Sequence, residues 1–133
     1  MNNYISNQSQ QFEGKVIIVT GSTQGSGAET AKLFAARGAK AITICGRQEN
    51  KGAEIKKEIE DLGSKCLYVK ADLSKVEDCK KIVELTDKEF GTVHSLVNVA
   101  GYTERGTILS TTLENYEKNF SINARAPFIL IQE

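Results

Sequence analysis

Short apolar runs alternate with longer charged segments along this chain, and that alternation limits the folds it can adopt. The apolar runs cover residues 15–20, 41–45, 66–69 and 95–99. Runs of this length are typical of strands covered on both faces, as in a parallel sheet. Helical spacing of apolar side chains occupies the intervening segments, residues 28–37, 50–62 and 75–90. The pattern predicts an α/β fold made of βαβ units around four parallel strands.

Residues suited to helix ends fall at the joins between these segments. Glycines that can form C-caps follow the three helical segments, at Gly38, Gly63 and Gly91. Capping boxes of the form S/T-x-x-E are predicted at Ser74 with Glu77 and at Thr111 with Glu114. The first box would begin the third helix, and the second would begin a fourth helix that runs to residue 133.

Length and charge narrow the classes of protein. The 133 residues suit one compact domain and are too few for two. Seventeen basic residues offset 17 acidic ones, and no stretch gathers the basic ones together. The expected partners therefore exclude nucleic acid and an anionic membrane surface. No apolar run approaches the roughly 18 residues of a membrane-spanning helix.

Residues 1–11 are rich in Asn, Gln and Ser and lack the basic and apolar regions of a secretory signal. We interpret them as a flexible tail, with one domain over residues 12–133. The odd set of Cys45, Cys66 and Cys79 has no C-x-x-C spacing and falls within strand or helix patterns, which favours buried free thiols. The expected compartment is cytoplasmic.

A glycine-rich loop joins the first apolar run to the first helical segment. It reads G-x-x-x-G-x-G from Gly21 to Gly27. Gly21 would allow the tight turn out of the strand, Gly25 the close approach of a pyrophosphate, and Gly27 close packing of the helix. The helix N-terminus would then direct its free N–H groups at the phosphates. The predicted cofactor-binding residues here are Gly21, Ser22, Thr23, Gln24, Gly25, Ser26 and Gly27.

Three further motifs follow in order along the chain. Asp72-Leu73 comes directly after the third apolar run, and Asn98-Val99-Ala100-Gly101 ends the fourth. The last motif is an asparagine in the final helical segment, Asn123, which lies in the stretch Ile-Asn-Ala-Arg-Ala-Pro-Phe.

With the glycine loop in its T-G-x-x-x-G-x-G form, these motifs resemble the short-chain dehydrogenase/reductase family over about residues 15–133. The resemblance implies an α/β Rossmann-type doubly wound parallel sheet, of which about four strands are present. It also implies an NAD(P)-binding domain that is the N-terminal, incomplete portion of a carbonyl/alcohol oxidoreductase. Further cofactor-binding residues implied by the resemblance are Asp72, Leu73, Asn98, Ala100 and Gly101. Asn123 corresponds to the asparagine of the family's catalytic tetrad.

The end of the second strand should decide which dinucleotide binds. An acidic residue there would hydrogen-bond the ribose 2′-OH of NAD, but the chain has Gly46 where NAD-specific family members usually carry Asp. Arg47 follows, and its guanidinium can bind a 2′-phosphate. We therefore expect NADP, with NAD as the alternative. Many NADP-dependent members also have a basic residue at the position of Gln24.

Pro127 lies four residues after Asn123 in the last predicted helix. Proline has no N–H, so the Asn123 carbonyl is expected to lose its helical partner and the helix to kink. In the resembled family the corresponding carbonyl holds a water that links the catalytic lysine to solvent. A kink required only for packing is the alternative interpretation.

The resemblance also implies a serine and a Tyr-x-x-x-Lys pair that this chain lacks. Its four tyrosines, at positions 4, 68, 102 and 116, are followed four residues later by Gln8, Asp72, Gly106 and Phe120. We therefore expect the 133-residue chain alone to be inactive, and the complete protein to be a homo-oligomeric enzyme acting on a small carbonyl or alcohol. The alternative is a truncated, non-catalytic fragment that binds a nucleotide or a partner.

Other chemistries fit the sequence less well. His94, the only histidine, begins the fourth strand, where a polar contact at the strand edge is the favoured role, and one histidine cannot form a metal site. A methyltransferase that binds S-adenosylmethionine on the same half-fold is disfavoured by the motifs at residues 98–101 and at Asn123. Tyr102 and Thr103 are predicted either to line the substrate entrance or to be surface loop residues.

Overall fold

Four parallel strands form the centre of the protein, whose computed structural model describes residues 10–133. They are β1 (Val16–Val19), β2 (Ala41–Gly46), β3 (Lys65–Lys70) and β4 (Ser95–Val97), in the sheet order β3-β2-β1-β4. All three pairings are parallel. Successive strands run outward from β1 to β3, and the chain then crosses back to place β4 on the other side of β1. The predicted doubly wound sheet is confirmed.

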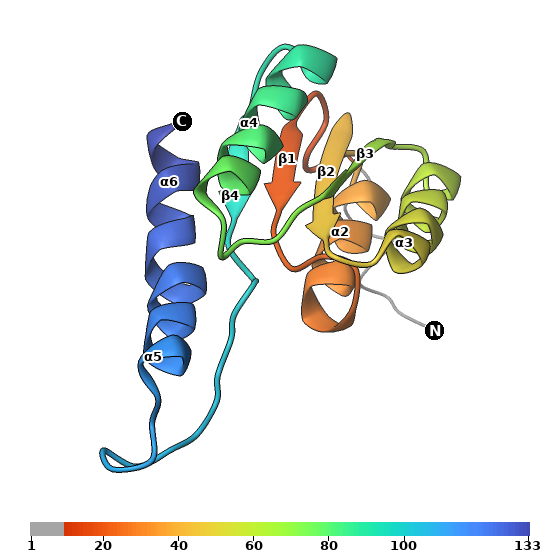
Figure 1. Ribbon diagram of the computed structural model, residues 1–133. Coiled ribbons are helices and arrows are strands. Elements are labelled where there is room, and N and C mark those ends of the chain that lie inside the picture. Colours follow the sequence, from red (N-terminus) through yellow and green to blue (C-terminus); the bar gives the residue numbers. More distant parts are fainter. Residues whose placement is uncertain (1–9) are drawn as a thin grey trace.

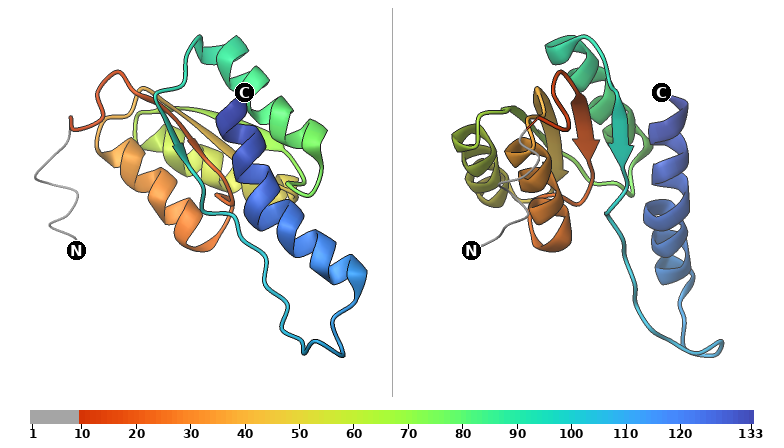
Figure 2. Two further views of the ribbon diagram at one scale, coloured as in Figure 1. Left: turned by 90° about the vertical axis from the view of Figure 1, so that its left-hand side faces the viewer. Right: turned by 180° about the vertical axis from the view of Figure 1, so that it is seen from behind.

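Helices cover both faces of this sheet (Figures 1 and 2). On one face are α2 (Gly25–Ala36) and α3 (Glu49–Asp61), and on the other are α4 (Val76–Phe90) and α6 (Ala126–Gln132). Alternate side chains of β1 enter the two cores, since Ile17 packs with the α2 and α3 residues and Ile18 with those of α4 and α6. Burial on both faces explains why the strand runs are almost entirely apolar.

The predicted helix C-caps are confirmed. Gly38, Gly63 and Gly91 have φ of 85°, 102° and 75°, in the left-handed region that favours glycine. Strand and helix bounds differ from the predicted ranges by at most three residues. The first helix differs most, since α2 already begins at Gly25, inside the glycine loop.

Both capping boxes were wrong. Lys75 is the N-cap of α4 and makes no side-chain cap, because the Ser74 hydroxyl donates instead to Asp72 Oδ1 at 2.7 Å. At α5 (Leu113–Phe120) the capping residue is Thr112 rather than Thr111, and its Oγ1 accepts the Asn115 N–H at 3.1 Å. In both places a nearby competing hydrogen bond decided the geometry, which spacing alone does not reveal.

The segment around Asn123 is a π-helical turn, η1 (Ser121–Arg125), between α5 and α6. The Ala126 N–H donates to the Ser121 carbonyl across five residues. Pro127 follows in the first turn of α6, where a missing N–H is tolerated best. Instead of a simple kink at Pro127, the helix contains a π-helical turn just before it. Such turns often occur at functional sites.

Three smaller predictions concern single residues. His94 makes the expected strand-edge contact. Its side-chain Nδ1 accepts the Val16 N–H, and its backbone N–H donates to the Val16 carbonyl, each at 2.9 Å. All three cysteines are buried and free, as predicted. Of the predicted tail, residues 1–9 lie outside the described residues, and Gln10 belongs to a turn, accepting the Glu13 N–H.

No helix within residues 10–133 has the length and apolar character needed to cross a membrane.

Candidate functional site

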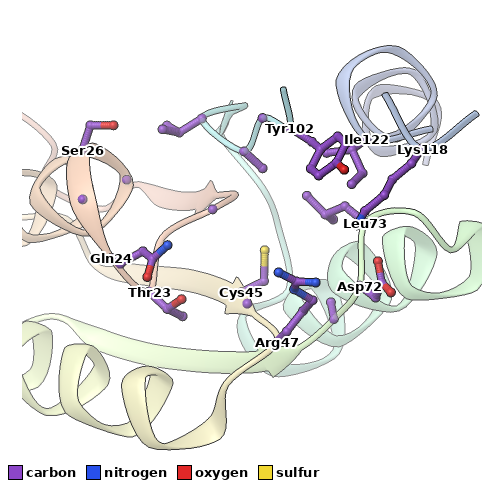
Figure 3. Close-up of a pocket in the computed structure, with 18 residues that line it drawn as sticks. Thr23, Gln24, Ser26, Cys45, Arg47, Asp72, Leu73, Tyr102, Lys118 and Ile122 are labelled. Atoms are coloured by element: carbon purple, nitrogen blue, oxygen red, sulfur yellow. The ribbon is translucent and has the colours of Figure 1, made fainter. Parts of the chain in front are cut away.

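A cavity of about 360 Å³ opens at the carboxyl ends of the strands. It lies where the chain order of the strands reverses between β1 and β4, the position at which open α/β sheets bind ligands. Figure 3 shows side chains from both ends of this cavity. Its lining is Gly21, Thr23, Gln24, Gly25, Ser26, Gly27, Cys45, Gly46, Arg47, Ala71, Asp72, Leu73, Val99, Ala100, Gly101, Tyr102, Lys118 and Ile122.

The glycines of the loop have the steric roles that their spacing predicted. Gly21 has φ of 59°, and a Cβ there would lie 2.7 Å from the Ala100 Cα. A Cβ on Gly27 would collide with the Gly21 carbonyl, so the start of α2 can fold directly over the turn. Gly25 has φ of 56° and no atom within 4 Å of a built Cβ, so it faces open space in the cavity wall. The loop thus presents bare backbone to any ligand there.

Thr20 joins the glycine loop to the turn after β4. Its side-chain Oγ1 accepts the N–H groups of Val99 and Ala100, each at 3.2 Å, and its own N–H donates to the Val97 carbonyl. Thr20 as a whole is buried. Thr20 is the threonine of the T-G-x-x-x-G-x-G motif, and its hydroxyl fixes the two loops that face the cavity.

Among the predicted cofactor-binding residues, all but Ser22 and Asn98 line the cavity. The Ser22 side chain is fully buried, where its hydroxyl donates to the Val19 carbonyl and accepts the Cys45 N–H at 3.0 Å. Ser22 therefore joins β1 to β2 from within. Asn98 is exposed at the end of β4.

Charged groups at the cavity are unevenly partnered. Asp72 Oδ1 accepts both the hydroxyl and the N–H of Ser74, and the hydroxyl contact is the largest cause of a lowered Asp72 pKa. The positive charge of Arg47 acts in the same direction. Within residues 10–133, no carboxylate lies within 4.0 Å of the Arg47 guanidinium as an ion-pair partner. Arg47 thus contributes an unneutralised positive charge to the wall.

Cys45 is on the cavity wall but is 1% exposed, and burial raises its pKa to about 12. Its thiol stays protonated at neutral pH and is unsuited to nucleophilic chemistry. Across residues 10–133, no three His, Cys, Asp or Glu side chains are grouped so that they could hold a metal ion.

Tyr102 and Lys118 also line the cavity. Sequence patterns assigned Tyr102 two alternative roles and Lys118 none. The Tyr102 hydroxyl donates to Glu104 Oε2 at 2.6 Å, and the Lys118 Nζ lies 4.4 Å from the centre of the Tyr102 ring. Of the two roles predicted for Tyr102, lining the cavity is therefore the one observed. Lys118 belongs to no sequence motif; it comes from α5 and lies near Tyr102 at the cavity (Figure 3).

Asn123 does not line the cavity but braces its wall. Its Oδ1 accepts the Tyr102 N–H at 2.8 Å, and its Nδ2 donates to the Tyr102 carbonyl at 2.6 Å. One side-chain amide therefore satisfies both backbone groups of a residue 21 positions earlier. This contact fixes the turn after β4 against η1.

Replacing Asn123 with alanine is expected to lower the free energy of unfolding by about 1–2 kcal/mol, since it removes two hydrogen bonds of ordinary strength. Urea unfolding followed by circular dichroism measures this. Asn119→Ala is the matched control, because the Asn119 amide bonds only within α5, to Asn115. Equal losses in the two variants would show that the Asn123 contact to Tyr102 adds no stability.

Comparison with known proteins agrees with this geometry. A family model described as short chain dehydrogenase matches residues 15–133, which is nearly all of the described chain. The chain belongs to the short-chain dehydrogenase family. It is 37% identical over 119 residues to an uncharacterized oxidoreductase of Thermotoga maritima, covering 90% of this chain and 46% of the relative.

Solved short-chain dehydrogenases have the same fold. One from Burkholderia cenocepacia, in complex with NADP, superposes with a TM-score of 0.88 at 29% identity and covers 92% of this chain and 50% of its own. The L-sorbose reductase of Gluconobacter frateurii, complexed with NADPH and L-sorbose, gives a TM-score of 0.88 at 29% identity, covering 94% and 47%. The chain spans about half the length of these relatives.

Proposed function

We propose that the cavity binds NADP(H) and that this chain is the cofactor-binding part of an oxidoreductase that interconverts a carbonyl and an alcohol. The observation that carries the proposal is the unneutralised Arg47 side chain on the cavity wall, directly after a Gly46 that offers no carboxylate to a ribose hydroxyl. The nucleotides bound by the two solved relatives, NADP and NADPH, support the same choice.

The residues present fit the adenine and pyrophosphate parts of such a cofactor. Bare backbone at Gly25 leaves room for a pyrophosphate beside the N-terminus of α2. The apolar side chains of Leu73, Ala100 and Ile122 also line the cavity and suit contact with a purine ring. When bound, NADPH would supply the hydride and NADP⁺ would accept it, and the residues described here would bind and orient the cofactor.

Thr23 strengthens the preference for a 2′-phosphate. A Cβ on Gly46 would lie 2.5 Å from the Thr23 Oγ1 and 2.7 Å from its Cγ2. The acidic side chain that would select NAD therefore has no room at position 46 unless Thr23 moves. NAD stays the alternative cofactor, and it would bind without a carboxylate contact to its ribose 2′-OH at position 46.

Replacing Arg47 with aspartate is expected to weaken NADPH binding by about 10- to 150-fold, because a hydrogen bond to a charged group contributes roughly 1.5–3 kcal/mol. NADH binding should change little or improve, since the new carboxylate repels only the 2′-phosphate. Isothermal titration with both nucleotides measures the two affinities. Equal losses for NADPH and NADH would contradict the proposed preference.

We further propose that the whole protein is a cytoplasmic homo-oligomer acting on a small carbonyl or alcohol. Three free, buried cysteines favour a reducing compartment. A set of apolar side chains on α5 and α6 is more than half exposed and favours contact with another copy: Leu113, Tyr116, Phe120, Phe128 and Ile131. The sugar bound by the sorbose reductase supports a small-molecule substrate.

The second candidate is a non-catalytic fragment that binds a nucleotide in the same cavity. Both candidates predict dinucleotide binding, so turnover separates them.

A further inference from the structure

The first turn of α3 lies beside the glycine loop, and one lysine joins them. Lys51 Nζ donates to Gln24 Oε1 at 2.6 Å, across 27 residues of sequence. Gln24 is exposed on the cavity wall, and Lys51, which is half-buried, does not itself line the cavity. Figure 3 shows Gln24 and Arg47 among the side chains of the same cavity.

Close packing fixes the position of Lys51. Its neighbour Gly52 has no side chain, and a Cβ there would collide with the Tyr68 ring of β3. The Tyr68 hydroxyl in turn donates to the Gly46 carbonyl at 2.8 Å. The start of α3 is therefore held against the end of β2, next to Arg47. Lys51 owes its place to this set of contacts.

The charge of Lys51 is not neutralised by its partner. Gln24 is uncharged, and within residues 10–133 Lys51 makes no ion pair, whereas Lys57 on the same helix pairs with Asp61 at 2.9 Å. Because Lys51 occupies the oxygen of the Gln24 amide, the amide NH₂ group is left to donate elsewhere. Arg47, also without an ion-pair partner, lines the same wall.

We propose that Lys51 is a second determinant of NADP(H) specificity, acting through Gln24. It orients the Gln24 amide so that the NH₂ group donates to the 2′-phosphate, and it adds its own positive charge behind that amide. The glycine loop has no basic residue between Gly21 and Gly27, and Lys51 provides the missing cation from α3. This inference rests on the proposed binding of NADP(H).

The test measures the affinities of NADPH, NADH, 2′,5′-ADP and 5′-AMP for the 133-residue chain by calorimetry, without any assay of turnover. Lys51→Gln is expected to weaken NADPH and 2′,5′-ADP about five- to tenfold and to leave NADH and 5′-AMP within twofold, in keeping with a partly screened charge. Lys51→Arg should restore most of the affinity. Lys57→Gln, which removes one charge from the same helix, is the matched control and should change none of the four.

Several outcomes would overturn the proposal. If Lys51→Gln weakened all four ligands equally, Lys51 would support the loop and not the phosphate. If it changed none of them while the unaltered chain preferred NADPH, Arg47 alone would carry the specificity, and the proposed function would stand without this inference. If the folded, unaltered chain bound no dinucleotide, the proposed function would fail and this inference with it.

Discussion

Replacing Gly25 with valine is expected to abolish dinucleotide binding while the chain stays folded. A Cβ at this position meets no atom of the protein within 4 Å, so the valine side chain would project into the open cavity. There it would occupy the space that a pyrophosphate needs next to the N–H groups of α2. Each hydrogen bond to a charged group contributes about 1.5–3 kcal/mol, and losing two or more lowers affinity by roughly a thousandfold.

The control must reproduce the backbone strain of this variant. Gly25 has φ of 56°, and a branched side chain in that region costs about 1–3 kcal/mol of stability. Gly91→Val carries comparable strain, since Gly91 has φ of 75° and equally open surroundings, but Gly91 does not line the cavity. It should be destabilised like Gly25→Val and bind NADPH normally. Unchanged NADPH affinity in folded Gly25→Val would mean that the loop does not hold the phosphates.

The sequence was sufficient for the sheet and for most of the cavity lining. Buried parallel strands need continuous apolar runs, which a sequence shows directly. Helix ends with positive φ favour glycine, so a single residue such as Gly38 indicates where a helix stops. The cofactor loop was recognisable because its glycines are required by the close approaches of Gly21 to Ala100 and of Gly27 to Gly21.

What the sequence could not predict depends on contacts between distant side chains. The contact of Lys51 with Gln24 exists because Gly52 lets α3 pack on Tyr68, and no local pattern records that. Ser22 was predicted to bind the cofactor from its place in the loop, yet its hydroxyl points inward, where it donates to the Val19 carbonyl and accepts the Cys45 N–H. Motif spacing predicts neither the contact of Lys51 nor the inward orientation of the Ser22 hydroxyl.

The same limit applies to the helix that contains Asn123. Pro127 predicts that the helix is disturbed but does not predict how. The structure shows a π-helical turn. The Asn123 amide, identified through a family motif, turns out to bind the Tyr102 backbone. Its catalytic role stays a prediction.

No hydride transfer is expected from the 133-residue chain with NADPH and any carbonyl substrate. Among residues 10–133, Tyr102 is the only tyrosine on the cavity wall, and its surroundings are opposite to those of a proton donor in catalysis. Its hydroxyl donates to the Glu104 carboxylate, which raises the tyrosine pKa. Lys118 contacts the ring face, with Nζ 4.4 Å from the ring centre, and does not offset this rise in the tyrosine pKa. Without general acid/base catalysis, about 10²- to 10⁴-fold in rate is lost.

The measurement is the consumption of NADPH over a panel of small ketones, aldehydes and sugars, followed by absorbance at high enzyme concentration. Tyr102→Phe is the decisive comparison, because it removes the hydroxyl while keeping the ring that Lys118 contacts. A slow rate that is the same with and without the Tyr102 hydroxyl would reflect proximity of cofactor and substrate alone. Robust turnover that disappears in Tyr102→Phe would instead show that Tyr102 and Lys118 form a working acid/base pair, and that the chain is an enzyme in its own right.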